Sequence, residues 1–193
     1  MLPLVLASSS PWRRALLEAA GLPVVCEAPG VDERAFQAPT AEALAGALAL
    51  AKASAVRERN PMAIVIGADQ VAWSDDDPTE AWGKPRDRVD QVERLHSLVG
   101  RAHHVTTGLA VLGPSFRDEV VVRTTLWMRS DVTKAEIEAY AATGEGEGCA
   151  GGYAVEQRGA FLFDRVEGDW NNVIGLPVAR LFDVLRARGW RFA

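Results

Sequence analysis

The chain opens with a short apolar segment that passes directly into a hydroxyl-rich turn and the start of a helix. Leu2 to Ala7 form an apolar run rich in branched residues, which predicts a buried strand. Ser10 and Pro11 follow this run; serine is a good N-cap, and proline suits the first position of a helix. A buried strand that leads directly into a helix is typical of α/β domains, in which helices pack against a sheet.

The same alternation continues along the rest of the chain. Apolar runs predict further strands at 22–26, 63–66 (continued across a kink at 71–73), 105–112, 120–128 and 161–166. Helices are expected after Pro11 and at 41–59, 88–98, 134–142 and 177–188. Residues 74–78 predict a turn, and residues 144–152, with five glycines, predict a loop. Because some strands alternate with helices and others are adjacent, we expect an α/β fold with a mixed, twisted sheet and flanking helices.

Length and composition favour a single globular domain over residues 1–193. Two cysteines, Cys26 and Cys149, form neither a disulfide framework nor a zinc motif. The formal net charge of −5 and the isoelectric point of about 5.3 argue against a nucleic-acid partner, because proteins that bind nucleic acid usually carry an excess of basic residues. No apolar stretch reaches the roughly 18 residues of a spanning helix, and the N-terminal run is too short for a signal peptide. We therefore expect a cytoplasmic protein without a membrane partner.

The first candidate site is the turn at Ser8 and the helix start that follows it. Free backbone N–H groups and the positive end of the helix dipole attract anions at such a place. Arg13 lies in the first turn, where its positive charge is unfavourable beside the positive end of the helix dipole. A bound phosphate would offset this repulsion. An ordinary serine cap with a surface arginine remains an alternative. Trp12 is either a core anchor or a platform for a flat ligand.

The second candidate site is formed by Asp69 and Gln70. They follow the apolar run 63–66, and a carboxylate directly after a buried strand lies where open α/β sheets bind ligands. Gln70 offers an amide to the same ligand. A solvated aspartate at the start of a turn would give the same pattern, so both explanations stay open.

Only three of the 21 basic residues are lysines, which draws attention to each of them. Lys84 stands between a glycine and a proline, so its backbone is constrained and its ammonium suits a phosphate contact, although an exposed loop lysine is the simpler explanation. Lys52 falls in an apolar helix, where a snorkelling stem is the simpler explanation. Glu33 suits a hard cation through its oxygens, although a surface acid is the simpler explanation.

Taken together, the order and spacing of these segments resemble the Maf family of nucleotide pyrophosphatases. The similarity extends over about residues 2–185. The segments that resemble family motifs are Ser8-Ser9-Ser10-Pro11-Trp12-Arg13, Asp32-Glu33, Gly67-Ala68-Asp69, Gly83-Lys84-Pro85, residues 100–107, Ala150-Gly151-Gly152-Tyr153 and residues 171–177.

The resemblance implies a cleft between two lobes and cleavage of a nucleoside triphosphate between its α and β phosphates. Mg²⁺ or Mn²⁺ is the implied cofactor, and a homodimer is the implied assembly. Asp69 matches the catalytic position as general base, metal ligand or both. By the same resemblance, Glu33 and Asp69 would hold the metal, and the phosphates would contact Ser8, Arg13, Lys52 and Lys84. The family's association with septum formation leaves a nucleotide-binding regulator without catalysis as an alternative, and a broad house-cleaning hydrolase is another.

The residues at three positions indicate which nucleotide base the site binds. The subgroup acting on dTTP and UTP typically has Arg, Thr and Gln there, whereas this chain has Trp12, Gln70 and Glu156, similar to the subgroup acting on 7-methyl-GTP. A tryptophan face attracts the cationic 7-methylguanine ring by roughly 0.5–2 kcal/mol. A carboxylate that accepts from guanine N1–H and N2–H₂ adds roughly 1.5–3 kcal/mol. We expect 7-methyl-GTP as substrate, with dTTP/UTP as the alternative; Gln157 and Arg158 depart from the plainer residues expected after Glu156.

Overall fold

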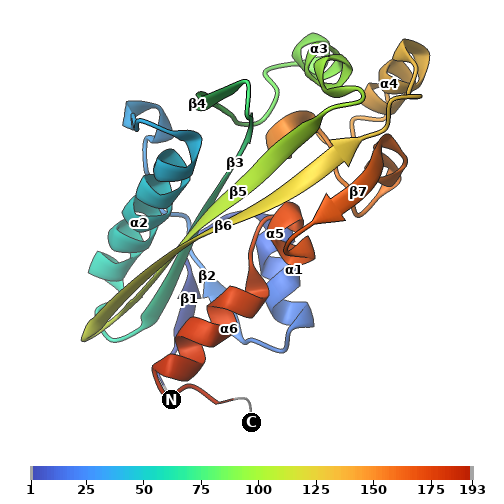
Figure 1. Ribbon diagram of the computed structural model, residues 1–193. Helices are drawn as coiled ribbons and strands as arrows, with labels where there is room; N and C mark the ends of the chain where they lie inside the picture. Colours follow the sequence, from blue (N-terminus) through green and yellow to red (C-terminus); the bar gives the residue numbers. More distant parts are fainter. Residues whose placement is uncertain (1, 192–193) are drawn as a thin grey trace.

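The computed structural model describes residues 2–191, and its centre is a seven-stranded twisted sheet (Figure 1). The strands are β1 (Leu4–Leu6), β2 (Val24–Cys26), β3 (Ile64–Ser74), β4 (Asp77–Trp82), β5 (Ala102–Gly113), β6 (Phe116–Met128) and β7 (Phe163–Glu167). Their order is β2-β1-β3-β5-β6-β7, and β4 pairs with β3. β1 runs parallel to β2 and β3, while the other pairs are antiparallel. The predicted mixed α/β fold is confirmed.

Helices cover both faces of the sheet near β1. The helices are α1 (Pro11–Ala19), α2 (Ala41–Arg59), α3 (Arg88–Leu98), α4 (Lys134–Ala141), α5 (Trp170–Ile174) and α6 (Val178–Ala187). Leu4 and Leu6 of β1 pack in one core cluster with α1 and α6, and Val5 packs in another with α2. This alternation follows from the two-residue period of a strand, and Figure 1 shows α2 on the opposite side of the sheet from α1 and α6.

A further core cluster forms at the other end of the long β5–β6 hairpin. There, Leu95 of α3 and Ile137 of α4 pack with Leu126 of β6, and Tyr153 and Phe163 join the same cluster. Figure 1 shows α3 and α4 beyond this end of the hairpin, far from the two termini. The molecule therefore has two packed regions joined by strands that run through both.

The predicted helices begin where their capping residues indicate. Thr40 accepts from the Ala43 N–H at the start of α2, and Asp87 caps α3 in the same way. Thr133 and Glu136 form the predicted capping box at the start of α4. Local side-chain chemistry was sufficient to place these helix starts.

One local prediction is wrong, and one helix was missed. Residues 74–78 are only partly a turn, because β4 begins at Asp77 and includes Pro78. β4 pairs with β3 alone, and a proline is tolerated in a strand with an unpaired edge. The short helix α5 was not predicted. Within residues 2–191, none of the helices combines the length and apolarity needed to cross a membrane.

Candidate active site

Helix α2 lies against β3 and β5 at unusually close range because two glycines face it. A Cβ atom on Gly67 would lie 2.3 Å from the Ala49 carbonyl oxygen, and one on Gly108 would lie 2.2 Å from the Ala45 carbonyl oxygen. No larger residue fits at either position without a shift of the backbone. The close approach brings the inner face of α2, which includes Lys52, against the middle of the sheet.

Asp69 lies in the middle of β3, so the prediction that it directly follows a strand is wrong. It pairs with Gly108 of β5, and β3 continues as far as Ser74. The strand does not end at Gly67 because β5 pairs with it as far as Trp73. Asp69 is 6% exposed and points toward Lys52 of the helix above. It is therefore a buried carboxylate held by a sheet, rather than a solvated one in a turn.

Lys52 connects two carboxylates. Its Nζ donates to Asp69 Oδ1 at 2.5 Å and lies 2.6 Å from Glu33 Oε1. The Lys52 and Asp69 side chains are each 8% exposed, whereas that of Glu33 is 55% exposed. Burial raises the pKa of Asp69, while the nearby Lys52 and Arg13 oppose that rise by favouring the ionised form. Lys52 is thus a buried, paired cation, and the snorkelling explanation is wrong.

The start of α1 faces the same buried pair. Ser10 caps the helix, and its own backbone N–H donates to Ser8 Oγ at 3.1 Å. Arg13 Nε donates to the Gly175 carbonyl oxygen at 2.9 Å, whereas the exposed Arg14 pairs with Glu18. Desolvation lowers the pKa of Arg13, and the charges of Asp69 and Glu33 raise it. Arg13 is therefore directed into the site, while Arg14 belongs to the surface.

One cleft of about 820 Å³ joins these groups. The nine candidate site residues predicted from the sequence line it, namely Ser8, Trp12, Arg13, Glu33, Lys52, Asp69, Gln70, Lys84 and Glu156. Lys84 is exposed, in the segment between β4 and α3, and Glu156 follows the glycine-rich segment 144–152. The expected cleft between two lobes is present, and it is lined by residues of α1, α2, β3 and α5 and by these two loops.

Trp12, Gln70 and Glu156 line the same cleft as the Lys52–Asp69 pair and differ in their environments. Trp12 is 38% exposed, so the alternative that it anchors the core is wrong. Gln70 Nε2 donates to the Asn172 carbonyl oxygen at 2.6 Å, which leaves its amide oxygen for other partners. Burial, followed by the charge of Glu145, raises the pKa of the half-buried Glu156.

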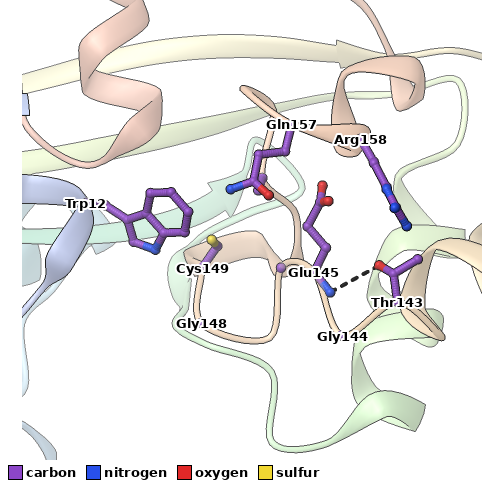
Figure 2. A pocket seen from close by; sticks show the side chains of 10 residues that line it. Trp12, Thr143, Gly144, Glu145, Gly148, Cys149, Gln157 and Arg158 are labelled. Atoms are coloured by element: carbon purple, nitrogen blue, oxygen red, sulfur yellow. Dashed lines mark hydrogen bonds between the residues drawn. The ribbon is translucent and has the colours of Figure 1, made fainter. Parts of the chain in front are cut away.

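A second cavity of about 460 Å³ adjoins the cleft and shares Trp12, Gly148 and Cys149 with it. Figure 2 shows Trp12 on one side and Arg158 on the other, with Gln157, Cys149 and Glu145 between them. Gln157 and Arg158, which follow Glu156 in the sequence, line this second cavity, whereas Glu156 lines the cleft. Burial raises the pKa of Cys149 to about 11, so its thiol is protonated near neutral pH.

Some residues that support the site were missed from the sequence. Asn172 is fully buried between β5 and β6, and its carbonyl oxygen holds Gln70. His103 Nε2 lies 2.6 Å from the Tyr153 hydroxyl, in the wall behind the cleft, and burial lowers the pKa of His103 to about 3. All three lie in segments that carry the family resemblance, but the sequence alone does not show which of them contact each other.

The comparisons with known proteins agree with this arrangement. A family profile described as "Maf-like protein" matches residues 3–188. A dTTP/UTP pyrophosphatase of Geobacillus sp. (strain WCH70) is 39% identical over 190 residues, which cover 98% of this chain and 100% of the relative. The dTTP/UTP pyrophosphatase of Thermus thermophilus is 42% identical over 189 residues, covering 98% of this chain and 96% of the relative. That of Symbiobacterium thermophilum is 40% identical over 191 residues, with the same coverage. Because the profile and the relatives match almost the full chain, the protein belongs to the family of Maf-like proteins.

Proposed function

We propose that this protein hydrolyses a nucleoside triphosphate between its α and β phosphates, giving the monophosphate and pyrophosphate. The observation that carries the proposal is the buried Lys52–Asp69 pair in a cleft that Arg13 and Ser8 also line. A site that only bound phosphates would need the cations, but it would not need a buried carboxylate among them. The names of the relatives, all pyrophosphatases, support the same reaction class.

In the proposed step, Asp69 accepts a proton from a water molecule whose oxygen attacks the α phosphorus. The bond between the α phosphorus and the oxygen bridging to the β phosphorus breaks, and pyrophosphate leaves with the bonding electrons. Lys52, 2.5 Å from Asp69, favours the ionised carboxylate against the burial that raises its pKa. Arg13 and Lys84 would neutralise the phosphate charges, and the Ser8 hydroxyl would donate to one of them.

The residues present fit a divalent cation that takes part of its ligands from the substrate. Among residues 2–191 there is no group of three or more histidine, cysteine or acidic side chains suited to hold a metal by itself. Glu33 and Asp69 supply two carboxylates, and Mg²⁺ is typically held by one or two carboxylates together with substrate phosphates and water. We propose that these two residues hold Mg²⁺ or Mn²⁺, which when bound would neutralise phosphate charge and polarise a phosphoryl oxygen.

The proposal also covers the nucleotide base of the substrate, for which two candidates have support. The relatives are named for dTTP and UTP, and these names favour a pyrimidine triphosphate over 7-methyl-GTP. The residues at the base end favour 7-methyl-GTP. Gln70 directs its amide N–H inward to Asn172, so Gln70 and Glu156 both offer acceptors to a ligand.

Acceptors suit guanine better than uracil or thymine. Guanine presents adjacent N1–H and N2–H₂ donors, whereas the N3–H of a pyrimidine is flanked by two carbonyl oxygens that a carboxylate repels. The exposed Trp12 ring adds a preference for the cationic ring of 7-methylguanine. We therefore propose 7-methyl-GTP as the preferred substrate and dTTP or UTP as the second candidate.

A four-nucleotide panel tests both levels of the proposal. Pyrophosphate and orthophosphate release would be measured separately with 7-methyl-GTP, GTP, UTP and dTTP, each with Mg²⁺ or Mn²⁺ and after chelation. Comparing 7-methyl-GTP with GTP tests the effect of the charged, methylated ring, and comparing GTP with UTP tests the donor edge together with ring size. We expect pyrophosphate without orthophosphate, and the highest kcat/KM for 7-methyl-GTP. A faster reaction with UTP or dTTP would reverse the base assignment; similar rates for all would indicate a house-cleaning hydrolase, and no turnover a nucleotide-binding regulator.

A further inference from the structure

We propose that the short helix α5 is a positioning element that fixes the base end and the phosphate end of the cleft relative to each other. Its anchor is a buried pair of side chains, Asn172 in the helix and Thr124 in β6. The inference rests on the proposed function, because it takes Gln70 to contact the base and Arg13 the phosphates. Asn172 and Thr124 would touch neither the substrate nor the reacting atoms.

The anchor attaches α5 to the sheet at two points. Asn172 Nδ2 lies 3.1 Å from the carbonyl oxygens of Val105 and Val122 and 3.0 Å from Thr124 Oγ1. Thr124 Oγ1 donates to the Asp169 carbonyl oxygen and accepts from the Asp169 N–H, both at 3.1 Å. Asp169 is the N-cap of α5, so the first turn of the helix is bound to β5 and β6 through fully buried groups.

Backbone carbonyl groups of α5 and of its C-cap hold the two substrate-facing side chains. The Asn172 carbonyl oxygen accepts from Gln70 Nε2 at 2.6 Å, and the Gly175 carbonyl oxygen accepts from Arg13 Nε at 2.9 Å. Gly175 has a φ of 134°, in the region that favours glycine, so this turn depends on its residue type. The bond to Arg13 uses Nε and leaves the terminal nitrogens of the guanidinium for an anion.

The helix cannot hold this position by its own stability. It has five residues, and isolated helices shorter than about 12 residues are marginal in water. Its place is therefore set by contacts with the rest of the protein, which are the packing of Val173 in the core and the polar contacts of Asn172 and Thr124 with the sheet. If these contacts are lost, Gln70 and Arg13 lose their fixed orientation together. A defect in the anchor should then weaken base discrimination and triphosphate binding in parallel, although the two side chains serve different parts of the substrate.

Two matched pairs of variants test this inference. Thr124→Val removes the hydroxyl while keeping the shape, and Thr124→Ser keeps the hydroxyl. Asn172→Ala removes the anchoring amide; the control Asn171→Ala alters the neighbouring residue, whose side chain makes no hydrogen bond recorded within residues 2–191. For each variant, kcat and KM would be measured with 7-methyl-GTP and UTP, together with the Kd of their α,β-methylene analogues and the melting temperature.

We expect Thr124→Val and Asn172→Ala to raise KM and the analogue Kd by about 10- to 100-fold, with a smaller change in kcat, because small displacements of binding groups have effects of this size. The ratio of kcat/KM between the two nucleotides should move toward one. Thr124→Ser and Asn171→Ala should stay near wild type.

Unchanged KM and nucleotide ratio in Thr124→Val, alongside a lower melting temperature, would overturn the inference and leave the anchor a purely structural feature. If Asn172→Ala does not fold, the Thr124→Val and Thr124→Ser pair decides the question alone. Absence of turnover in the wild type would contradict the proposed function, while the analogue Kd values would still test the positioning role. Absence of analogue binding by the wild type would overturn both.

Discussion

The two ends of the cleft are built in different ways. At the end proposed to bind the phosphates (the phosphate end), Lys52 and Asp69 come from a helix and a strand that glycines bring close together, and both side chains are buried. At the end proposed to bind the base (the base end), Trp12 is exposed, and Glu156 is half-buried beside a loop in which Gly146, Gly151 and Gly152 have positive φ. One end is fixed by the core of the fold, and the other by a loop and a helix terminus.

We propose that, because of this difference, one end of the cleft determines the reaction and the other determines which base is bound. The Lys52–Asp69 pair joins a helix to the sheet, and replacing one partner alone would leave the other charge buried and unpaired, so a single substitution there is costly. A half-exposed side chain beside a loop can be replaced with little effect on folding. We therefore expect substitutions at the phosphate end to affect turnover or stability strongly, and substitutions at the base end to affect mainly the selection of nucleotide.

The strongest test of the phosphate end is Asp69→Asn, which keeps the shape and removes the proton acceptor. We expect kcat to fall by about 10²–10⁴-fold if Asp69 is the general base. Pyrophosphate release at saturating nucleotide would measure it. Asp183→Asn, at an exposed position on α6, is a matched control that should keep wild-type turnover. Near-wild-type turnover of Asp69→Asn with an unchanged metal requirement would remove Asp69 from the mechanism.

Replacing Lys52 tests the phosphate end through its effect on the stability of the folded protein. Lys52→Met keeps the length of the side chain but leaves Asp69 buried without its cation. Removing one partner of a buried pair destabilises by about 3–5 kcal/mol, so a large drop in melting temperature is expected together with loss of activity. Lys134→Met removes an exposed lysine and should melt like wild type. Equal melting temperatures of Lys52→Met and wild type would show that the phosphate end is not stabilised by this pair.

The sequence was sufficient to predict most of the fold because its signals are local. The caps Thr40, Asp87 and Thr133 mark helix starts through side-chain contacts within one turn. Strand pairing is less local: the extension of β3 through Asp69 depends on β5, more than thirty residues away in the chain. That is why Asp69 was expected at a strand end and not within the strand.

Prediction of the site from the sequence has the same limit as prediction of the strand pairing. Motif resemblance singled out the residues that line the cleft, but it could not show that Lys52 connects Asp69 and Glu33, because the three come from separate elements. It also missed α5: its five residues are too few to give a periodic signal, and its position comes from Asn172. Contacts between distant segments were the information that the sequence did not contain.

At the base end, Glu156→Gln should alter selectivity more than turnover. The amide places a donor against guanine's own donors, and a group left unsatisfied in this way costs roughly 1–3 kcal/mol. We expect kcat/KM for 7-methyl-GTP to fall by about 5- to 150-fold, with a much smaller change for UTP. Gln157→Glu, at the adjacent position on the second cavity, is a control for charge near the cleft. An equal fall for both nucleotides would mean that Glu156 serves the reaction and not the base.

The smallest expected effect concerns the stability of the same variant as a function of pH. Burial raises the folded-state pKa of Glu156 above the ordinary 4.5, so the folded protein binds this proton more readily than the unfolded chain does. The ionised side chain therefore destabilises the fold at neutral pH, and this penalty disappears as the pH falls through the raised pKa toward 4.5. Glu156→Gln carries no such penalty, so we expect it to be slightly more stable than wild type at pH 7 and no more stable near pH 4.5. Urea unfolding of both proteins across this pH range would measure the difference in stability. Glu147→Gln, in the glycine-rich segment 144–152, is a control for the change in net charge. A difference that stays constant, or grows, on acidification would mean that Glu156 is not desolvated in the folded protein, and the contrast between a buried phosphate end and an open base end would then be sharper still.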